Sequence, residues 1–115
     1  MRKRIKKRQL GRVKKQRKAL FKSLATALIL NGRIRTTQTK AKTIRPIIEK
    51  IITQAKKDTV AQRRLLRKRL SEEAVKKIYL QITPKYIERK GGYTRIIKLP
   101  KRYPDGARMA VIELV

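Results

Sequence analysis

The sequence predicts an α+β fold: a two-layer domain of about four helices against a small mixed sheet, with a basic N-terminal arm. Isoleucines at helical spacing dominate residues 34–56, and β-branched residues typical of strands occupy residues 93–99 and 108–115. The first 18 residues consist largely of lysine and arginine. A chain of 115 residues can bury one modest core, so we expect a single domain.

Positive charge dominates the composition. The chain has 35 lysines and arginines against 7 acidic residues, a formal net charge of +28. A compact chain of this charge repels itself unless a polyanion supplies the counter-charge, which makes nucleic acid the first candidate partner. Histidine and cysteine are both absent, so Ser/His or Cys/His catalysis and thiolate metal sites are excluded. We therefore expect no enzyme, no metal, no cofactor and no small-molecule substrate.

Residues 1–18 are predicted to form an arm that is disordered when free and ordered on nucleic acid, with the compact domain at residues 19–115. The arm holds eleven basic residues and no acidic one, too little apolar surface to offset the entropy of ordering. A solvated tail kept for solubility is the alternative, but it needs fewer charges. The candidate phosphate-binding residues here are Arg2, Lys3, Arg4, Lys6, Lys7, Arg8, Arg12, Lys14, Lys15, Arg17 and Lys18.

The next elements are a helix over residues 19–31 and a strand over residues 33–37. Asn31 and Gly32 end the helix because both tolerate the left-handed conformation. The strand mixes β-branched residues with arginines. No acidic residue precedes Glu49, so the N-terminal half is the predicted main nucleic-acid face.

The central helix carries the core, because Ile44, Ile47, Ile48, Ile51, Ile52 and Ala55 share one side of it. We expect Thr39 to cap this helix, Pro46 to bend it and its end to lie near residue 57. A later cap at Thr43, which would place Pro46 harmlessly in the first turn, is the alternative.

Two further helices are predicted. Asp58 and Thr59 cap the first, over residues 60–70, with Val60, Ala61, Leu65 and Leu66 facing inward. Ser71 caps the second, and Glu72 and Glu73 in its first turn favour the helix dipole. Its buried residues are Ala74, Val75, Ile78 and Ile82. Pro84 is expected to end it, with one short turn at residues 85–90.

Residues 91 and 92 are glycines that end the helical pattern. The two predicted strands that follow are expected to form a hairpin with a long basic loop. This hairpin and the strand at residues 33–37 complete the sheet.

Several short sequence blocks, spread in order along the whole chain, resemble the bacterial large-subunit ribosomal protein 17 family. The blocks that agree are MRKR at the start, RQLGR at 8–12, RKAL at 17–20, DTVAQRR at 58–64, GGYTRI at 91–96, MAVIEL at 109–114 and, in the central stretch, Ile34, Thr36, Thr37, residues 40–42, Glu49, residues 51–53 and residues 55–56. Lys3 and Gln16 stand where the family usually has histidine. The resemblance implies a helix, a strand, three helices and a hairpin.

The resemblance also implies a function. It implies a structural constituent of the large ribosomal subunit, bound to its large rRNA of the 23S type near the peptide exit tunnel, among neighbouring ribosomal proteins. The location implied is the cytoplasm, in a bacterial ribosome, with an organellar ribosome as the alternative. Besides the arm, the candidate rRNA-binding residues are Arg33, Arg35, Thr36, Thr37, Lys40, Lys42 and Tyr93, with Arg95, Lys98, Lys101 and Arg102 on the hairpin as weaker ones. Tyr93 and Tyr103 either stack on bases or pack on the fold.

Three other classes of function remain as alternatives. A free-standing DNA-compacting protein would share the charge and the salt dependence. A membrane-active protein would use basic amphipathic helices, but the isoleucines follow a globular pattern, tryptophan is absent, and no apolar run approaches the roughly 20 residues of a membrane span. No signal peptide is expected either, because the start is charged. An RNA-directed enzyme has no candidate site.

Overall fold

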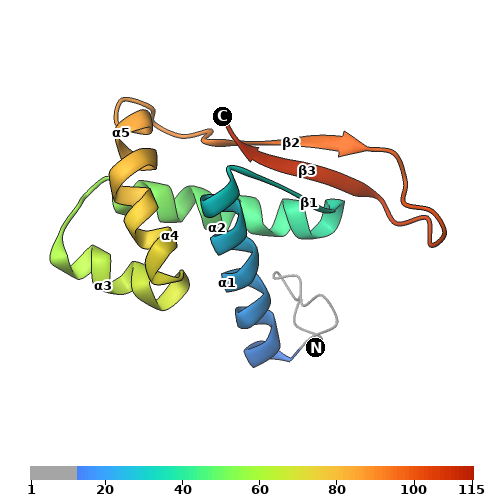
Figure 1. Cartoon of the computed structure of the whole chain (residues 1–115), viewed down its shortest axis with the longest axis horizontal. Coiled ribbons are helices and arrows are strands. Elements are labelled where there is room, and N and C mark those ends of the chain that lie inside the picture. The colour runs from blue at the N-terminus through green and yellow to red at the C-terminus, as the bar shows by residue number, and fades with distance from the viewer. Residues whose placement is uncertain (1–12) are drawn as a thin grey trace, which may run out of the picture.

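The computed structural model describes residues 13–115, and it has the predicted α+β architecture (Figure 1). The elements in chain order are α1 (Lys14–Asn31), β1 (Arg33–Thr37), α2 (Gln38–Ala55), α3 (Val60–Arg69), α4 (Glu72–Lys77), the π-helix η1 (Ile78–Ile82), α5 (Thr83–Tyr86), β2 (Thr94–Leu99) and β3 (Met109–Leu114). The predictions for Arg2, Lys3, Arg4, Lys6, Lys7, Arg8 and Arg12 lie outside the described residues.

The three strands form one sheet in the order β1-β3-β2, so the C-terminal hairpin pairs with the early strand as predicted. Both pairings are antiparallel, and the expectation of a mixed sheet was wrong. Ile34, Ile112 and Ile96 lie side by side across the sheet. Figure 1 shows the helices on one side of the sheet, with α2 running along it.

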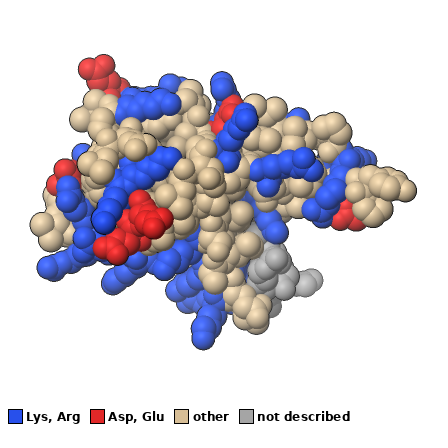
Figure 2. Space-filling view, in the orientation of Figure 1, with Lys and Arg blue, Asp and Glu red and all other residues tan. Residues whose placement is uncertain are grey.

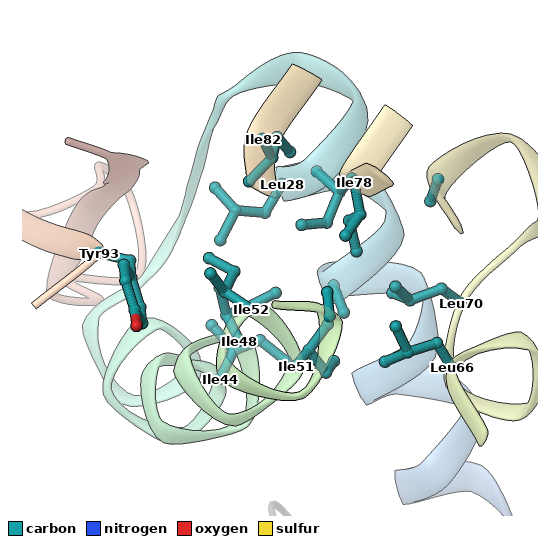
Figure 3. Close-up of a cluster of buried hydrophobic side chains, with 14 of the residues drawn as sticks. Leu28, Ile44, Ile48, Ile51, Ile52, Leu66, Leu70, Ile78, Ile82 and Tyr93 are labelled. Carbon is teal, nitrogen blue, oxygen red and sulfur yellow. The ribbon is translucent and has the colours of Figure 1, made fainter. Parts of the chain in front are cut away.

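The core forms around the predicted isoleucine stripe of α2. Ile44, Ile48, Ile51 and Ile52 are fully buried (Figure 3). Ile47 is only partly buried. Leu28 of α1, Leu66 of α3, Ile78 of η1 and Ile112 of β3 complete the same cluster. α1, α3, η1 and β3 all contribute side chains to this cluster around α2. We therefore regard α2 as the element on which the domain assembles.

Helix α1 begins at Lys14, five residues before the predicted start at residue 19. Residues 14–18, which were assigned to the arm, are helical because lysine, glutamine and arginine are good helix formers despite their charge. The predicted end is confirmed: Gly32 has φ +80°, and its backbone N–H donates a hydrogen bond to the Leu28 carbonyl.

The N-cap of α2 is Thr37, not Thr39. Its hydroxyl oxygen accepts a hydrogen bond from the Lys40 backbone N–H at 3.4 Å. Pro46 therefore lies inside a continuous helix, which supports an early start over the alternative cap at Thr43. The helix ends at Ala55, two residues before the expected end.

Helix α3 has its predicted cap but not its predicted inner face. Thr59 accepts a hydrogen bond from the Gln62 backbone N–H at 3.2 Å. Leu66 is buried, but Val60, Ala61 and Leu65 are exposed. The short helix is anchored by Leu66 and by Leu70 just beyond its end, so the rest of its surface faces outward.

The last helical segment is longer than predicted because Pro84 does not end it. Ser71 caps α4 as expected, and Ala74, Val75, Ile78 and Ile82 are buried. The wider turn of η1, closed by a hydrogen bond from the Thr83 N–H to the Ile78 carbonyl, precedes the proline. Such a turn makes room for a ring that would otherwise clash with the carbonyl four residues earlier.

Candidate nucleic-acid interface

The basic side chains of α1 that were predicted to bind phosphate are on its first turns. Lys14, Lys15 and Lys18 are exposed and Arg17 is half-buried. None of these four has an ion-pair partner among residues 13–115. The helix presents them as a fixed cluster of positive charge that no acidic group of residues 13–115 offsets.

The second predicted patch is divided between two faces of the sheet. Side chains alternate along β1, so Arg33 and Arg35 project from the face opposite Ile34, and both are exposed. Thr36 lies on the same face as Ile34. Lys42 is on the flank of α2 and also lies on the helical side of the sheet. The structure therefore brings Arg33 and Arg35 together and separates them from Lys42.

Two of the predicted contacts in this second patch have structural roles. The hydroxyl oxygen of Thr37 is the N-cap of α2. Lys40 supplies the backbone N–H of that cap, and its side chain is half-buried. Each of these two residues therefore has a role in the fold itself.

Arg95 lies on the outer face of the sheet, beside Glu113 and in line with Arg33. The Arg95 Nε lies 2.5 Å from the Glu113 Oε1. This ion pair offsets part of the charge of the outer face, so Arg33 and Arg35 are the cations left uncompensated there by the described residues.

Arg102 is tied to the hairpin loop by Asp105. The Arg102 Nη2 lies 2.6 Å from the Asp105 Oδ2, and its Nε lies 3.2 Å from both carboxylate oxygens. These hydrogen bonds and one from the Ala107 backbone N–H lower the pKa of Asp105 from 3.8 to about 2. Lys101 and Tyr103 are exposed on the same loop, and Tyr103 keeps 94% of its surface accessible.

We predict that Arg102→Gln returns the pKa of Asp105 towards 3.8, because it removes the largest cause of the shift. A folded-state pKa below the unfolded value stabilises the loop above the unfolded pKa, and this stabilisation is lost as pH falls from about 4 to about 2. Carboxyl-carbon NMR titration of Asp105 checks both values. A midpoint near 3.8 in the unsubstituted chain would contradict the observed ion pair.

Tyr93 is part of the core, so of its two predicted roles the structure supports packing on the fold. It is 1% exposed. Its ring centroid lies 5.3 Å from that of Tyr86, and Lys56 Nζ lies 4.7 Å from the Tyr93 centroid. The Tyr93 hydroxyl donates to the Arg89 carbonyl at 3.1 Å. No face of this ring is open to an RNA base.

The sequence reasoning missed the cations of α3. Arg64, Arg67, Lys68 and Arg69 are exposed and have no ion-pair partner among the residues that the structure describes. Arg63, by contrast, pairs with Asp58 at 2.7 Å and lies over the ring of Tyr79. The run RRLLRKR is the sequence signal for these cations, although its leucines predict a buried face. Figure 2 shows Lys and Arg spread from α3 to the hairpin loop, with smaller, separate patches of acidic groups among them.

Two kinds of feature are absent from residues 13–115. This part of the chain holds no group of three or more acidic side chains placed to bind a metal ion. It also has no helix that is long and apolar enough to cross a membrane.

Comparison with known proteins identifies relatives over the whole chain. A family model described as ribosomal protein L17 matches residues 20–115. A protein of Persephonella marina is 53% identical over 118 residues, which cover 100% of this chain and 95% of the relative. A protein of Exiguobacterium sp. is 48% identical over 113 residues, 93% of this chain and 97% of the relative. A third, from Chlorobium phaeovibrioides, is 52% identical over 94% of this chain and 62% of its own length. All three are named large ribosomal subunit protein bL17.

Proposed function

The chain belongs to the ribosomal protein L17 family, and we propose from this membership that it is a structural constituent of the large ribosomal subunit. It binds the large rRNA, of the 23S type, through its basic arm and basic surfaces. Its place is near the peptide exit tunnel, in contact with neighbouring ribosomal proteins of a bacterial, cytoplasmic ribosome. It has no catalytic role.

The observation that carries this proposal is the excess of exposed cations that no acidic group of the described residues offsets. Arg33 and Arg35 lie on the outer face of the sheet, whereas Arg64 and Arg67 on α3 and Lys14 at the start of α1 belong to the helical layer on its other side (Figure 1). A partner that balances charge on both sides at once must surround the domain. A folded rRNA offers phosphates in this way, whereas a flat membrane surface meets only one face.

The mechanism follows from phosphate chemistry. Lysine and arginine neutralise phosphates and release condensed counterions, so the affinity falls as salt is added. If about eight phosphates are engaged, the logarithm of the affinity falls with the logarithm of salt with a slope of roughly −6 to −7. Arginine adds forked hydrogen bonds to phosphate and stacks on unpaired bases.

Sucrose-gradient fractionation of cell lysates at low and high salt tests this function. We expect the chain to sediment with large subunits in both, because contacts on both sides of the domain must break together for it to leave. A DNA-compacting protein would instead be released by nuclease digestion of DNA and would be absent from large subunits. Recovery of the chain only outside ribosomal particles would contradict the proposal.

A further inference from the structure

A groove of about 460 Å³ lies between α2 and β2. Its α2 wall holds Lys42, Arg45, Pro46 and Glu49, and its β2 wall holds Ile96 and Lys98. The α2 residues share one flank of the helix because they follow each other at steps of three and four. This flank is separate from the buried isoleucine stripe. The spacing of the isoleucines therefore leaves this side of α2 outside the core.

The order of the strands creates the other wall. β2 is an edge strand, and Ile96 and Lys98 lie on the face of the sheet that carries Ile112 and Ala110. Burial falls toward this edge: Ile112 is fully buried beneath the helices, Ile96 is half-buried and Lys98 is exposed. The edge of the sheet thus extends past α2 and leaves an open groove beside it.

The groove carries more positive than negative charge. The single acid, Glu49, is already engaged, because its Oε1 accepts a hydrogen bond from the Thr94 hydroxyl at 3.2 Å and lies 3.9 Å from Arg45 Nε. Lys42 and Lys98 have no ion-pair partner among the described residues. Thr94 and Glu49 mark one end of the groove, and Lys98 lies further along β2, roughly 13 Å from Thr94 at the usual rise of a strand. The uncompensated positive charge is therefore at the end away from Glu49.

The remaining lining is apolar. Pro46 and Ile96 face the groove from opposite walls, and Pro46 is exposed although it lies inside a helix. Proline also lacks a backbone N–H, so this part of the wall offers no backbone donor. Cations at one end and an apolar surface beside them match the two parts of a nucleotide, a phosphate and the flat face of a nucleoside. An apolar peptide would fit the second part and leave both lysines without counter-charge.

We propose that this groove receives an unpaired segment of RNA, with a phosphate on Lys42 and Lys98 and a nucleoside against Pro46 and Ile96. The groove volume falls in the range of small-ligand sites, roughly 300–1,000 Å³, which is large enough for a nucleotide. The inference rests on the proposed rRNA-binding function and assigns one part of that contact. It adds Arg45, Pro46 and Ile96 to the residues expected from the sequence.

The first test measures binding of the full chain to a transcript of large-subunit rRNA as a function of salt. Lys42→Gln with Lys98→Gln removes two charges from the groove. Lys57→Gln with Lys90→Gln, two exposed lysines away from it, is the matched control. Both lysines contact the same phosphate in this proposal. At about 0.7 per phosphate contact, we therefore expect the groove pair to reduce the steepness of the salt dependence by about 0.7 and the affinity in 0.1 M salt about fivefold. The control pair is expected to change the affinity less than threefold.

The outcomes separate this inference from the function on which it rests. If the unsubstituted chain binds with a steep salt dependence, but the groove pair and the control pair lose equal affinity, the groove proposal alone is overturned. If the unsubstituted chain does not bind the transcript, both proposals fall. Circular dichroism of each variant confirms that the fold is kept.

A second test identifies the occupant in assembled particles. Gln38 lines the mouth of the groove, and a photoreactive benzoyl-phenylalanine placed there reacts with whatever lies within it. Irradiation of purified large subunits is expected to give an RNA adduct that ribonuclease reduces to a short oligonucleotide. An adduct to another protein, or none in particles that contain the chain, would overturn the proposal.

Discussion

Replacement of the seven basic residues in positions 1–12 by glutamine is expected to weaken rRNA binding more than any other change considered. Each phosphate contact with single-stranded nucleic acid contributes about 0.7 to the salt dependence. Seven such contacts contribute about 5, which corresponds to a loss of affinity of up to about 10⁵-fold in 0.1 M salt. Filter binding of the full-length chain to a large-subunit rRNA transcript, at several salt concentrations, measures both quantities.

The control for this prediction neutralises lysines outside residues 1–12 in the full-length chain. Lys57, Lys76, Lys85 and Lys90 are exposed lysines outside the proposed contacts, and their joint replacement by glutamine is expected to reduce the salt dependence less per charge. An equal effect per charge would mean that only net charge matters, and the arm would lose its assigned role. The far-ultraviolet circular dichroism of the arm variant should stay close to that of the unsubstituted chain, because the core lies in residues 19–115.

Ile48→Ala is expected to lower the free energy of unfolding by about 3–4 kcal/mol, the usual cost of truncating a fully buried isoleucine. Ile48 belongs to the α2 stripe on which the helices and sheet assemble, so the cavity opens in the centre of the core (Figure 3). Urea unfolding followed by circular dichroism, in salt that screens the net charge, measures the loss.

Leu80→Ala is the matched control for the core. Leu80 is 76% exposed within η1, and its truncation is expected to change the free energy of unfolding by less than about 0.5 kcal/mol. Equal effects for Ile48 and Leu80 would show that α2 does not organise the core.

The sequence predicted well those elements in which local and long-range preferences agree. The strand Arg33–Thr37 was predicted with its observed bounds, because a helix stop at Gly32 and β-branched residues point to the same conformation. The isoleucines of α2 share one face and are buried for the same reason. The hairpin followed from the two glycines, the change of hydrophobic period and the turn residues between its strands.

Predictions failed where tertiary packing decides. Val60 and Leu65 were expected inside, but α3 needs only Leu66 and Leu70 to attach to the body, and no local rule identifies which of four apolar residues does so. Pro84 was expected to end a helix, yet a π-turn one residue earlier accommodates it. Helix α1 begins at Lys14 and not at residue 19, in this case because the helix propensity of residues 14–18 outweighs their charge.

The candidate interface was predictable in part for the same reasons. The sequence predicts Arg33 and Arg35 as contacts because they are arginines in an otherwise β-branched strand, and in the structure strand alternation places both on the outer face of the sheet. The groove needed the structure, because Lys42 and Lys98 are distant in the chain and meet only through the order of the strands. The role of Tyr93 also needed the structure. An aromatic residue beside basic ones fits a stacking site and a core equally well until its burial is known.

A density map of large ribosomal subunits that contain this chain tests the central claim most directly. The claim is that rRNA phosphates balance the cations that the chain's own acids leave uncompensated. We expect phosphates within about 4 Å of the Arg33, Arg64, Arg67 and Lys98 side chains, the distance of direct ion pairs. A map in which these four side chains face solvent or other proteins, or in which the particles are complete without the chain, would contradict the account.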